Sequence, residues 1–437
     1  MKKLFIADIV DKIDQEVELY GWVNNIRDHK KIIFVDLRDR SGILQVVGDS
    51  SFKKLSPEDV IYVKGIVKKR PENMVNKNIL TGEIEVQVKE WKIIAESEEL
   101  PIDLSKDELN VTLPTLLDNR PLSLRHPKIR SIFTIQTTII DEFRNSLKNL
   151  GFKEFQAPIL VPAQAESGAE VFSVSYFDHK AYLAQSPQLY KQIMLGAFEK
   201  AFTVTHAFRA EPSVTTRHLT EYISLDAEMA FIESWQDLMD TVEIVIKNIV
   251  SAVFSNNKEE IKLFKTEKPI ISDPIPRIKL SEALKIVGER LKQDLSDESD
   301  LSPAHEEEIC KWASEEKKSD FIFITHYPTV KRPFYTHPDP ENPDLTLSFD
   351  LLGLGIEWVT GGQRINDYKK LVENIKKWGN NPKDFDIYLQ AFKYGMPPEG
   401  GFAMGTERIT MKLLNLSNVR EASLFPRDME RIDIKLS

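Results

Sequence analysis

The first hundred residues alternate between apolar and polar side chains in short runs. Four such runs are VELYGWVNNIR, KKIIFVDLRDRSGILQVVGD, DVIYVKGIVKKR and ILTGEIEVQVKEWKIIAES, and turn sequences such as DRSG and LTGE interrupt them. Alternation with a period of two is typical of strands that bury one face. About five short strands in this length predict a small closed barrel, and the OB-fold is the commonest such module. An SH3-like barrel or a small sandwich would show the same pattern.

The pattern changes after residue 102. Residues 103–128 contain several prolines and no sustained period, which predicts a linker. The segment KIRSIFTIQTTIIDEFRNSLKNLGF then repeats its apolar residues at a helical spacing, and Gly151 follows where a helix would end. We therefore expect a barrel over residues 1–102, then the linker, then a second domain over residues 129–437.

The second domain mixes apolar strand candidates with helices. Strands are predicted at FQAPILVP, AFTVTHAF, YISLDAEMAFI, DFIFITHYP and LTLSFDLLGLGIEWVTGG, without a regular strand–helix–strand repeat. This order favours an α+β domain built on an antiparallel sheet that helices flank. A charged helical stretch at residues 278–320 has the character of an insertion at one side of that sheet.

The composition is that of an ordinary globular protein with two or three domains. The 437 residues are 41% hydrophobic and 29% charged, and no apolar run is long enough to span a membrane. The first residues soon turn acidic, unlike a secretory signal. Cys310 is the single cysteine, which excludes an internal disulfide and suits a reducing cytoplasm. The net charge of −10 argues only weakly against nucleic acid, because a local basic face can exist on an acidic protein.

One segment carries charges between two apolar strands. It reads HAFRAEPSVTTRHLTE and spans residues 206–221. Charged side chains beside core strands are costly unless a charged partner meets them. Arg209 and Glu211 would project from one strand face, and the arginine fork suits a phosphate group. The returning loop adds three side chains that suit a nucleotide, namely Arg217, His218 and Tyr222. A surface hairpin with solvated charges is the simpler alternative.

A second segment, FDLLGLGIEWVTGGQR, places carboxylates among apolar neighbours. Asp350 and Glu357, with Thr360 just beyond, form a set that suits a divalent cation such as Mg²⁺ beside a triphosphate. The Gly-Gly pair permits close approach of a ligand to the backbone, and Arg364 follows it. A twisted strand end would explain the glycines equally well.

Three further segments carry isolated polar residues. GGFAMGTERIT runs from a glycine-rich strand into a helix near Arg408, and it contains neither a P-loop nor a dinucleotide fingerprint. In YLAQSPQLYKQIM, Gln188 and Lys191 are spaced to lie on one helical face. AQAESGAEVF is a loop of small residues that carries Glu166. Each signal is weak alone.

Together the segments resemble the class II aminoacyl-tRNA synthetases. GFKEFQAP, with the helix before it, resembles motif 1 of that family, FRAE…RHLTEY resembles motif 2, and GFAMGTERI resembles motif 3. QSPQLYKQ is similar to the corresponding segment of aspartyl-tRNA synthetases, and the resemblance covers nearly the whole chain. The length, with no large insertion between motifs 2 and 3, resembles the archaeal and eukaryotic type.

The resemblance implies an ATP site at motifs 2 and 3. It assigns Arg209 to the α-phosphate and Arg408 to the γ-phosphate, and both to catalysis through charge stabilisation. The other nucleotide ligands would be Glu211 and Tyr222 at the adenine, Arg217 and His218 at the outer phosphates, and Glu357. The ligands of Mg²⁺ would be Asp350, Glu357 and Thr360. In-line attack by a substrate carboxylate needs positioning and positive charge, so we expect no protein nucleophile and no dedicated general base.

The resemblance further implies L-aspartate as the amino acid. Lys191 and Arg364 would pair with its side-chain carboxylate, and asparagine would leave both cations unpaired in a dry pocket. The lysine is typically absent from asparaginyl-tRNA synthetases, which otherwise share this framework. Gln188 and Glu166 would hold the substrate ammonium, and Thr360 would line the same pocket.

The barrel resembles the anticodon-binding OB domain of the family. Phe34 would stack on an anticodon base, and Arg27 and Gln45 would read base edges of tRNA(Asp). A core position is the alternative for Phe34. The loop after GWV, with Asn24, fits neither strict recognition of tRNA(Asp) nor relaxed recognition of tRNA(Asn), so the sequence leaves this choice open.

Three other functions compete with this interpretation. An asparaginyl-tRNA synthetase is the nearest, a synthetase-derived paralogue without charging activity is the second, and a stand-alone amidating enzyme on the same core is the third. The intact arginines of motifs 2 and 3 argue against the paralogue, and the N-terminal barrel argues against the amidating enzyme. The family dimerises through motif 1, so the resemblance also implies a two-fold homodimer.

Overall fold

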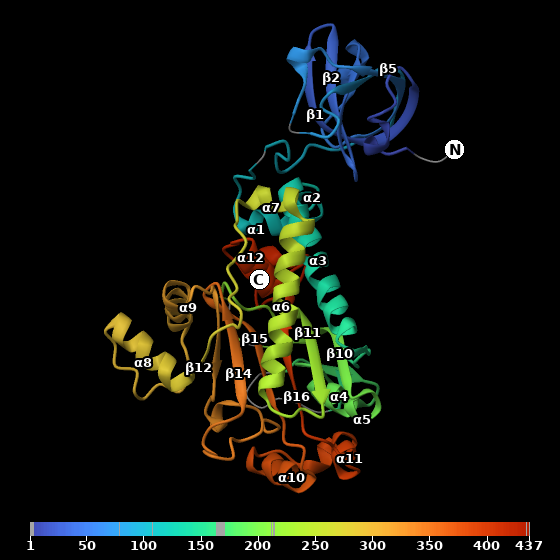
Figure 1. Ribbon diagram of the computed structural model, residues 1–437. Helices are drawn as coiled ribbons and strands as arrows, with labels where there is room; N and C mark the ends of the chain where they lie inside the picture. Colours follow the sequence, from blue (N-terminus) through green and yellow to red (C-terminus); the bar gives the residue numbers. More distant parts are fainter. Residues whose placement is uncertain are drawn as a thin grey trace. The chain divides into compact units, whose positions relative to one another are not determined.

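The structure is a computed structural model, and it divides the chain into two units, residues 1–126 and 127–437 (Figure 1). It describes residues 4–77, 79–106, 108–162, 171–210, 212, 215–433 and 435–436. Among the helices in these ranges, none is both long and apolar enough to cross a membrane.

The first unit contains a closed barrel, which confirms the predicted OB-fold. Its strands follow the order β1 (Glu16–His29), β2 (Ile32–Asp39), β3 (Gly42–Gly48), β5 (Ile84–Ala95) and β4 (Val60–Lys69). Neighbouring strands are antiparallel except for β3 and β5, which are parallel. Alternate residues such as Ile33, Val35 and Leu37 fill the interior, as the period of two predicts. Short 3-10 helices are η1 (Ile6–Ile9), η2 (Ser50–Lys54) and η3 (Glu72–Met74).

Two short helices occupy part of the segment predicted as a linker, α1 (Leu113–Asp118) and α2 (Arg120–Ser123). The side chain of Thr112 caps α1 by accepting a hydrogen bond from the backbone of Thr115. Further along, Arg125 pairs with Glu58 of the barrel unit at 2.8 Å. Because Glu58 also pairs with Arg38 at 2.9 Å, this end of the segment is tied to the first unit.

The second unit is built on a mixed sheet, which confirms the predicted α+β class. The strand order is β12 (Arg277–Lys279), β13 (Phe321–Thr325), β14 (Ser348–Gly353), β15 (Ile356–Gln363), β16 (Glu399–Gly405), β11 (Glu221–Ala230), β10 (Lys200–Phe208) and β6 (Lys153–Glu154). The central strands are antiparallel as predicted, whereas the edge pairs β12–β13 and β6–β10 are parallel. A small second sheet joins β7 (Leu160–Val161), β9 (His179–Leu183) and β8 (Ser173–Tyr176).

Helices cover one face of the large sheet and bury its main core (Figure 1). They are α3 (Pro127–Asn149), α6 (Gln236–Asn256), α7 (Lys258–Phe264) and α12 (Thr406–Leu413). Gly151 has a φ of +88°, which suits glycine just beyond the end of α3. Elsewhere the unit contains α4 (Gln188–Ile193), α5 (Leu195–Phe198), α10 (Tyr368–Lys377), α11 (Asp386–Lys393), η4 (Thr329–Lys331), η5 (Pro382–Phe385) and η6 (Val419–Ala422).

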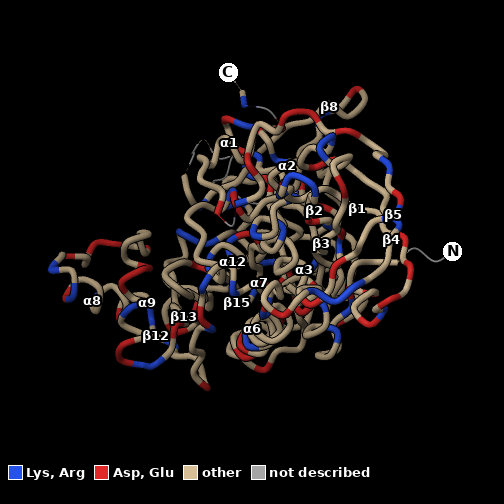
Figure 2. The backbone as a smooth tube through the Cα atoms, turned by 90° about the horizontal axis from the view of Figure 1, so that it is seen from above, with Lys and Arg blue, Asp and Glu red and all other residues tan. Residues whose placement is uncertain are grey.

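The segment predicted as a helical insertion forms α8 (Leu280–Leu291) and α9 (Pro303–Lys317) beside the β12–β13 edge (Figure 1). The two helices share an apolar core with β13 that includes Val287, Ile309 and Ile322. Cys310 belongs to this core, and its burial raises the pKa of the thiol to about 12. Figure 2 shows both acidic and basic positions along this segment.

Candidate active site

A cavity of about 340 Å³ is lined by residues of strands β11, β15 and β16, of helix α4 and of the first turn of α12. Most of the predicted site residues line it: Gln188, Lys191, Arg209, Arg217, His218, Tyr222, Glu357, Thr360, Arg364 and Arg408. Asp350 instead lines a neighbouring cavity of about 160 Å³, which shares Arg332 and Glu357 with the first. Glu166 and Glu211 lie outside the residues that the structure describes.

Strand alternation on β11 brings polar groups to the cavity. Leu225 and Ala227 belong to the core beneath the helices, whereas Ser224, Asp226 and Glu228 point to the other face. All three of these polar residues are nearly completely buried. Buried carboxylates require cationic or hydrogen-bonding partners, so this strand predicts cations directly opposite.

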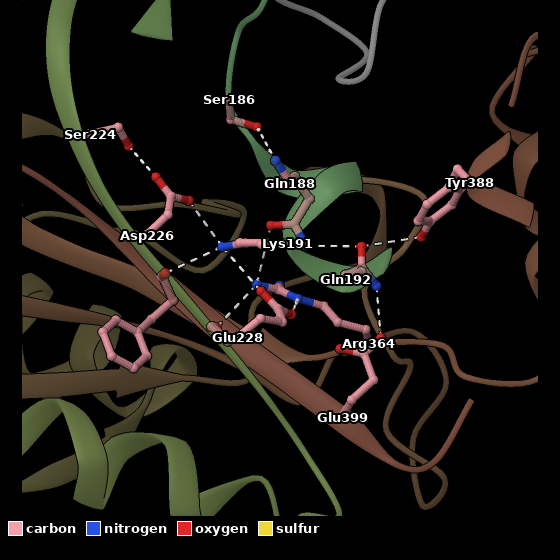
Figure 3. A network of polar contacts seen from close by, with 12 residues as sticks. Ser186, Gln188, Lys191, Gln192, Ser224, Asp226, Glu228, Arg364, Tyr388 and Glu399 are labelled. Atoms are coloured by element: carbon pink, nitrogen blue, oxygen red, sulfur yellow. Dashed lines mark hydrogen bonds and ion pairs between the residues drawn. The ribbon is translucent and has the colours of Figure 1, made fainter. Parts of the chain in front are cut away.

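The first of these cations is Lys191 on α4 (Figure 3). Its ammonium lies 3.0 Å from Oδ1 of Asp226 and 3.1 Å from Oε2 of Glu228, and it is 3.3 Å from the carbonyl oxygen of Phe402. The hydroxyl of Ser224 donates to the other oxygen of Asp226. The floor of the cavity is therefore charged, and its charged side chains are paired with one another.

The second cation is Arg364, which follows β15. Its Nε lies 2.8 Å from Oε1 of Glu228, and its Nη2 donates to the carbonyl of Gly401 at 3.0 Å and to Gln188 at 3.5 Å. Burial favours the protonated carboxyl of Glu228, but Arg364 and Lys191 together outweigh it and lower that pKa. Glycine is required at position 401 because a Cβ there would lie 2.1 Å from Oε2 of Glu228.

Gln188 belongs to an amide network that extends behind the two cations (Figure 3). Its Nε2 donates to Gln192 at 2.9 Å, and Gln192 in turn donates to Glu399 at 2.7 Å. The hydroxyl of Tyr388 donates to Gln192 as well. Burial and the nearby Glu228 raise the pKa of Glu399 well above its usual range, so this carboxyl stays neutral.

Arg209 and Tyr222 face each other at the end of the β10–β11 hairpin. Strand β10 ends at Phe208, so Arg209 lies just beyond the strand. The sequence analysis had placed Arg209 within the strand. Its backbone N–H still donates to the carbonyl of Thr220 at 2.9 Å. The guanidinium carbon lies 5.8 Å from the centre of the Tyr222 ring, within the range of a cation–π contact.

Three basic side chains line the cavity near motif 3. Arg408 contacts Glu357 through its carboxylate at 3.5 Å and through its backbone carbonyl at 3.2 Å. Nδ1 of His218 lies 2.6 Å from the hydroxyl of Thr215. The third is Arg217, whose guanidinium pairs with Glu306 of helix α9 at 2.8 Å. Arg217 and His218 therefore each contact a protein group and also line the cavity.

The predicted metal ligands Asp350 and Thr360 are cross-strand partners on β14 and β15. An arginine that the sequence analysis missed, Arg332, bridges them: its guanidinium donates to Asp350 at 2.7 Å and to Thr360 at 3.0 Å. The hydroxyl of Thr360 accepts this hydrogen bond from Arg332 and keeps a second acceptor lone pair. Oδ1 of Asp350 is buried without a hydrogen-bond partner in the described part of the chain, and Glu357 opens on both cavities.

The carboxylates of Asp350 and Glu357 suit a cation that arrives with a bound nucleotide, and not one that the protein holds alone. Within the described ranges no group of three or more His, Cys, Asp or Glu side chains is arranged to hold a metal ion. Mg²⁺ is commonly held by one or two carboxylates together with the phosphates of a nucleotide. Glu357 and Asp350 meet that requirement, and the hydroxyl of Thr360 lies beside them while it accepts a hydrogen bond from Arg332.

The predicted anticodon residues share the outer face of the barrel. Phe34 is half-buried and lies outside the barrel core, and Arg27 is its cross-strand partner. The guanidinium of Arg27 contacts Asp36 at 2.6 Å and Gln45 at 3.0 Å, and the amide of Gln45 donates to Glu85 at 2.7 Å. A half-buried ring on the outer face, beside an ordered polar network, is a surface on which a base could stack.

The sequence analysis missed several residues in and around the two cavities. Asp226 and Glu228 had a signal, since SLDAE places polar residues at alternate positions of an otherwise apolar strand. Arg332 and Glu306 had none, because their partners lie on separate elements and only the fold brings them together.

Known proteins match both units. The profile of the tRNA synthetases class II (D, K and N) matches residues 112–429, and that of the OB-fold nucleic acid binding domain matches residues 17–94. The aspartate–tRNA(Asp/Asn) ligase of Deinococcus radiodurans is 40% identical over 99% of each chain, and the aspartate–tRNA(Asp) ligase of Pyrococcus furiosus is 39% identical over 96% of each. The solved asparaginyl-tRNA synthetase of Pyrococcus horikoshii with asparaginyl-adenylate superposes with a TM-score of 0.89, at 33% identity and 99% coverage of both chains.

Proposed function

Because this chain belongs to the class II tRNA synthetases of the D, K and N group, we propose that it ligates L-aspartate to tRNA(Asp) with ATP. The full-length similarity to two aspartate–tRNA ligases supports this choice within the group. One of these relatives is named for both tRNA(Asp) and tRNA(Asn), and the other for tRNA(Asp) alone. The range of tRNAs is therefore part of the test below.

The pairing of Lys191 and Arg364 with acidic residues carries the proposal. Both cations are buried, and Asp226 and Glu228 balance their charge. Aspartate brings an ammonium for Asp226 and a side-chain carboxylate for Lys191, so every charge keeps a partner. Asparagine brings the ammonium without that carboxylate, so the buried cluster would gain one positive charge that no negative charge balances. Gln188, and Glu166 beyond the described residues, remain proposed ligands of the ammonium, with Thr360 in the same pocket.

The proposed reaction has two steps. The α-carboxylate of aspartate attacks the α-phosphorus of ATP, pyrophosphate leaves, and aspartyl-adenylate forms. The ribose hydroxyl at the 3′ end of the tRNA then attacks the acyl carbon, and AMP leaves. Arg209 would stabilise charge on the α-phosphate and Arg408 on the γ-phosphate, where donors already in place need no reorganisation. Tyr222 and Glu211 would hold the adenine, with Arg217 and His218 at the outer phosphates.

Magnesium is the proposed companion of ATP. Glu357 and Asp350 would hold the ion, with Thr360 as a further ligand through the second lone pair of its hydroxyl oxygen. The ion would supply positive charge to the phosphates during displacement of pyrophosphate. The chain's own contribution is to fix Glu357 beside Arg408 and to keep Asp350 anchored on Arg332.

For the barrel, we propose that Phe34 stacks on an anticodon base while Arg27 and Gln45 read base edges. Their shared outer face supports this role. We also propose a cytoplasmic homodimer. Apolar side chains exposed at and beside the small sheet, among them Leu160 and Phe177, support an interface between copies near motif 1.

The test is charging of purified tRNA(Asp) and tRNA(Asn) with labelled aspartate and, in parallel, labelled asparagine. Aspartate on tRNA(Asp) alone indicates a discriminating ligase, and aspartate on both tRNAs indicates relaxed anticodon reading. Asparagine on tRNA(Asn) would overturn the role of Lys191 and establish the asparaginyl alternative, which the solved neighbour keeps open. No charging of either tRNA would favour the paralogue.

A further inference from the structure

We propose that Glu306 of helix α9 is a positioning residue for ATP, because it holds Arg217 of motif 2 against the wall of the cavity. This inference rests on the proposed function, in which Arg217 meets the outer phosphates. Glu306 lies in the segment that interrupts the synthetase core between β12 and β13, outside every motif that the sequence analysis identified. The insertion would then complete the nucleotide site.

The contact between the two residues is direct. Nη1 of Arg217 donates to Oε2 of Glu306 at 2.8 Å, and Nη2 donates to the carbonyl oxygen of Gly355 at 3.4 Å. The two side chains are 24% and 16% exposed, so the pair is largely shielded from water. A guanidinium has five donors, and these two contacts leave others for a ligand in the cavity that Arg217 lines.

Arg217 needs an external support because of where it lies in the chain. It belongs to the segment between β10 and β11, and long arginine side chains in such segments lose considerable entropy when a ligand orders them. A partner that fixes the guanidinium beforehand lowers that cost. Within the described residues, Glu306 is the carboxylate that pairs with it.

Helix α9 is rigid enough to provide the support. Ser302 caps its first turn, and Ile309 and Cys310, on the turn after Glu306, are buried in the core shared with β13. Glu308 ties the helix to α8 through Arg290 at 2.6 Å. A displacement of Glu306 would therefore disturb a packed element and not merely a loop.

The charges around Glu306 suit a supporting role. Burial and the carboxylate of Glu357 raise the pKa of Glu306 to about 7, although Arg217 and Arg408 act in the opposite direction. The carboxyl group of Glu306 can accept the hydrogen bond from Arg217 in either protonation state. The opposite hypothesis is that Glu306 competes with ATP for Arg217, and it predicts the opposite change in affinity.

The experiment is aspartate-dependent exchange of pyrophosphate into ATP by the full-length protein. Glu306→Ala is expected to raise the KM for ATP roughly fivefold, since one charge-assisted contact no longer positions Arg217. The kcat and the KM for aspartate should stay within about twofold, because neither depends on the support. Glu306→Gln should recover most of the affinity, as its amide oxygen accepts the same hydrogen bond. Glu307→Ala, one position along the same helix and paired with Lys311, is the matched control.

A double-mutant cycle tests whether Glu306 acts through Arg217. Arg217→Ala should raise the KM for ATP by more than Glu306→Ala, and the double variant should match Arg217→Ala alone. Additive effects, an unchanged KM, or a lower KM in Glu306→Ala would each overturn the proposal. Should Glu306→Ala lower the thermal midpoint, Glu306→Asp replaces it, because the shorter side chain keeps the charge but withdraws it from Arg217.

Direct titration with ATP separates this inference from the proposed function. Calorimetry with ATP alone requires no aspartate and no tRNA. Weaker ATP binding by Glu306→Ala, together with no aspartate-dependent exchange in the unsubstituted protein, would retain the inference and reject aspartate as the substrate. Normal exchange by the unsubstituted protein, together with unchanged ATP binding by Glu306→Ala, would support aspartate as the substrate and reject the role of Glu306.

Discussion

Nζ of Lys191 lies 3.0 Å from Oδ1 of Asp226, and each side chain is only 1% exposed. Two charges taken so completely from water lose their hydration, and their mutual contact, with Glu228 and Ser224 as further partners, offsets that loss. The pair also lies at the floor of the cavity that Arg209 and Arg408 line. The pair therefore affects both the stability of the fold and the chemistry of the cavity, and substitutions must be chosen so that the two effects can be measured separately.

Lys191→Met is expected to lower the free energy of unfolding by about 3–5 kcal/mol, because it leaves buried carboxylates without their cation. Exchange of pyrophosphate with aspartate should fall at least roughly hundredfold. The double substitution Lys191→Met with Asp226→Asn should regain part of the stability and none of the activity. Denaturant unfolding and exchange assays measure the two effects, and Lys377→Met, at an exposed lysine, is the control. Recovery of activity in the double variant would contradict the proposed role of Lys191.

The two proposed magnesium ligands should respond differently to substitution. Glu357→Gln should raise the Mg²⁺ concentration needed for half-maximal exchange with little change in thermal midpoint, because this side chain is partly exposed. Asp350→Asn should also destabilise the fold, by about 3 kcal/mol, because it removes the charged partner of the buried Arg332. Magnesium titrations and thermal unfolding of both variants provide the measurements. A shift in Mg²⁺ dependence for neither variant would reject this pair as ligands.

Patterns confined to one segment predicted much of this architecture. The period of two that gave the barrel, and the helical spacing that gave α3 with Gly151 after it, both depend on neighbours in sequence. The convergence of Lys191, Arg209, Glu357, Arg364 and Arg408 on one cavity required the family resemblance, since no spacing relates these segments.

Contacts between distant elements could not be predicted. Arg332 reaches across to Asp350 and Thr360 from a loop, and nothing near it in sequence distinguishes it from a solvated arginine. The sequence analysis predicted only a charged helical insertion over residues 278–320, and it gave no sign that Glu306 is largely buried against Arg217. Such pairs depend on how β12, β13 and the insertion pack, and local periodicity carries no information about that packing.

Phe34→Ala should weaken tRNA recognition without affecting amino acid activation. The ring lies on the outer face of the barrel and not in its core, so its loss should cost little stability. Stacking on a base is worth about 1–3 kcal/mol, which predicts a rise of roughly fivefold to hundredfold in the KM for tRNA(Asp). Charging kinetics test this, with aspartate-dependent exchange as the internal reference. Tyr394→Ala removes a 79% exposed ring from the other unit and is the matched control.

Cys310 should be unreactive in the folded protein. Its burial raises the pKa of the thiol to about 12, so at pH 8 hardly any thiolate is present. A disulfide reagent should label the native chain very slowly and the denatured chain at once, with one equivalent incorporated, since Cys310 is the single cysteine. Rapid labelling of the native protein would show that α9 opens readily and would weaken its role as a rigid support for Glu306.

Glu407 provides a test of pH dependence at the start of helix α12. Its carboxylate oxygens lie 3.0 and 3.1 Å from the backbone nitrogen of Ile223, which donates to them, and the side chain is almost fully buried. Burial raises the pKa of Glu407 to about 8, and the hydrogen bond from Ile223 only partly opposes it. The folded chain therefore binds this proton more tightly than the unfolded chain, in which the ordinary pKa is about 4.5.

The sign of the resulting effect follows from linkage. The stabilising contribution of Glu407 is fully present below about pH 4.5, declines as the pH rises, and is lost above about pH 8. Glu407→Gln keeps an acceptor for Ile223 and cannot ionise, so its stability relative to the unsubstituted chain should increase steadily between pH 5 and pH 8.5. Thermal midpoints of both proteins across that range provide the measurement. The exposed substitution Glu373→Gln removes the same charge from the surface and is the control. A difference that stayed constant, or declined, toward alkaline pH would show that Glu407 is already ionised at neutral pH and that its environment favours the charge.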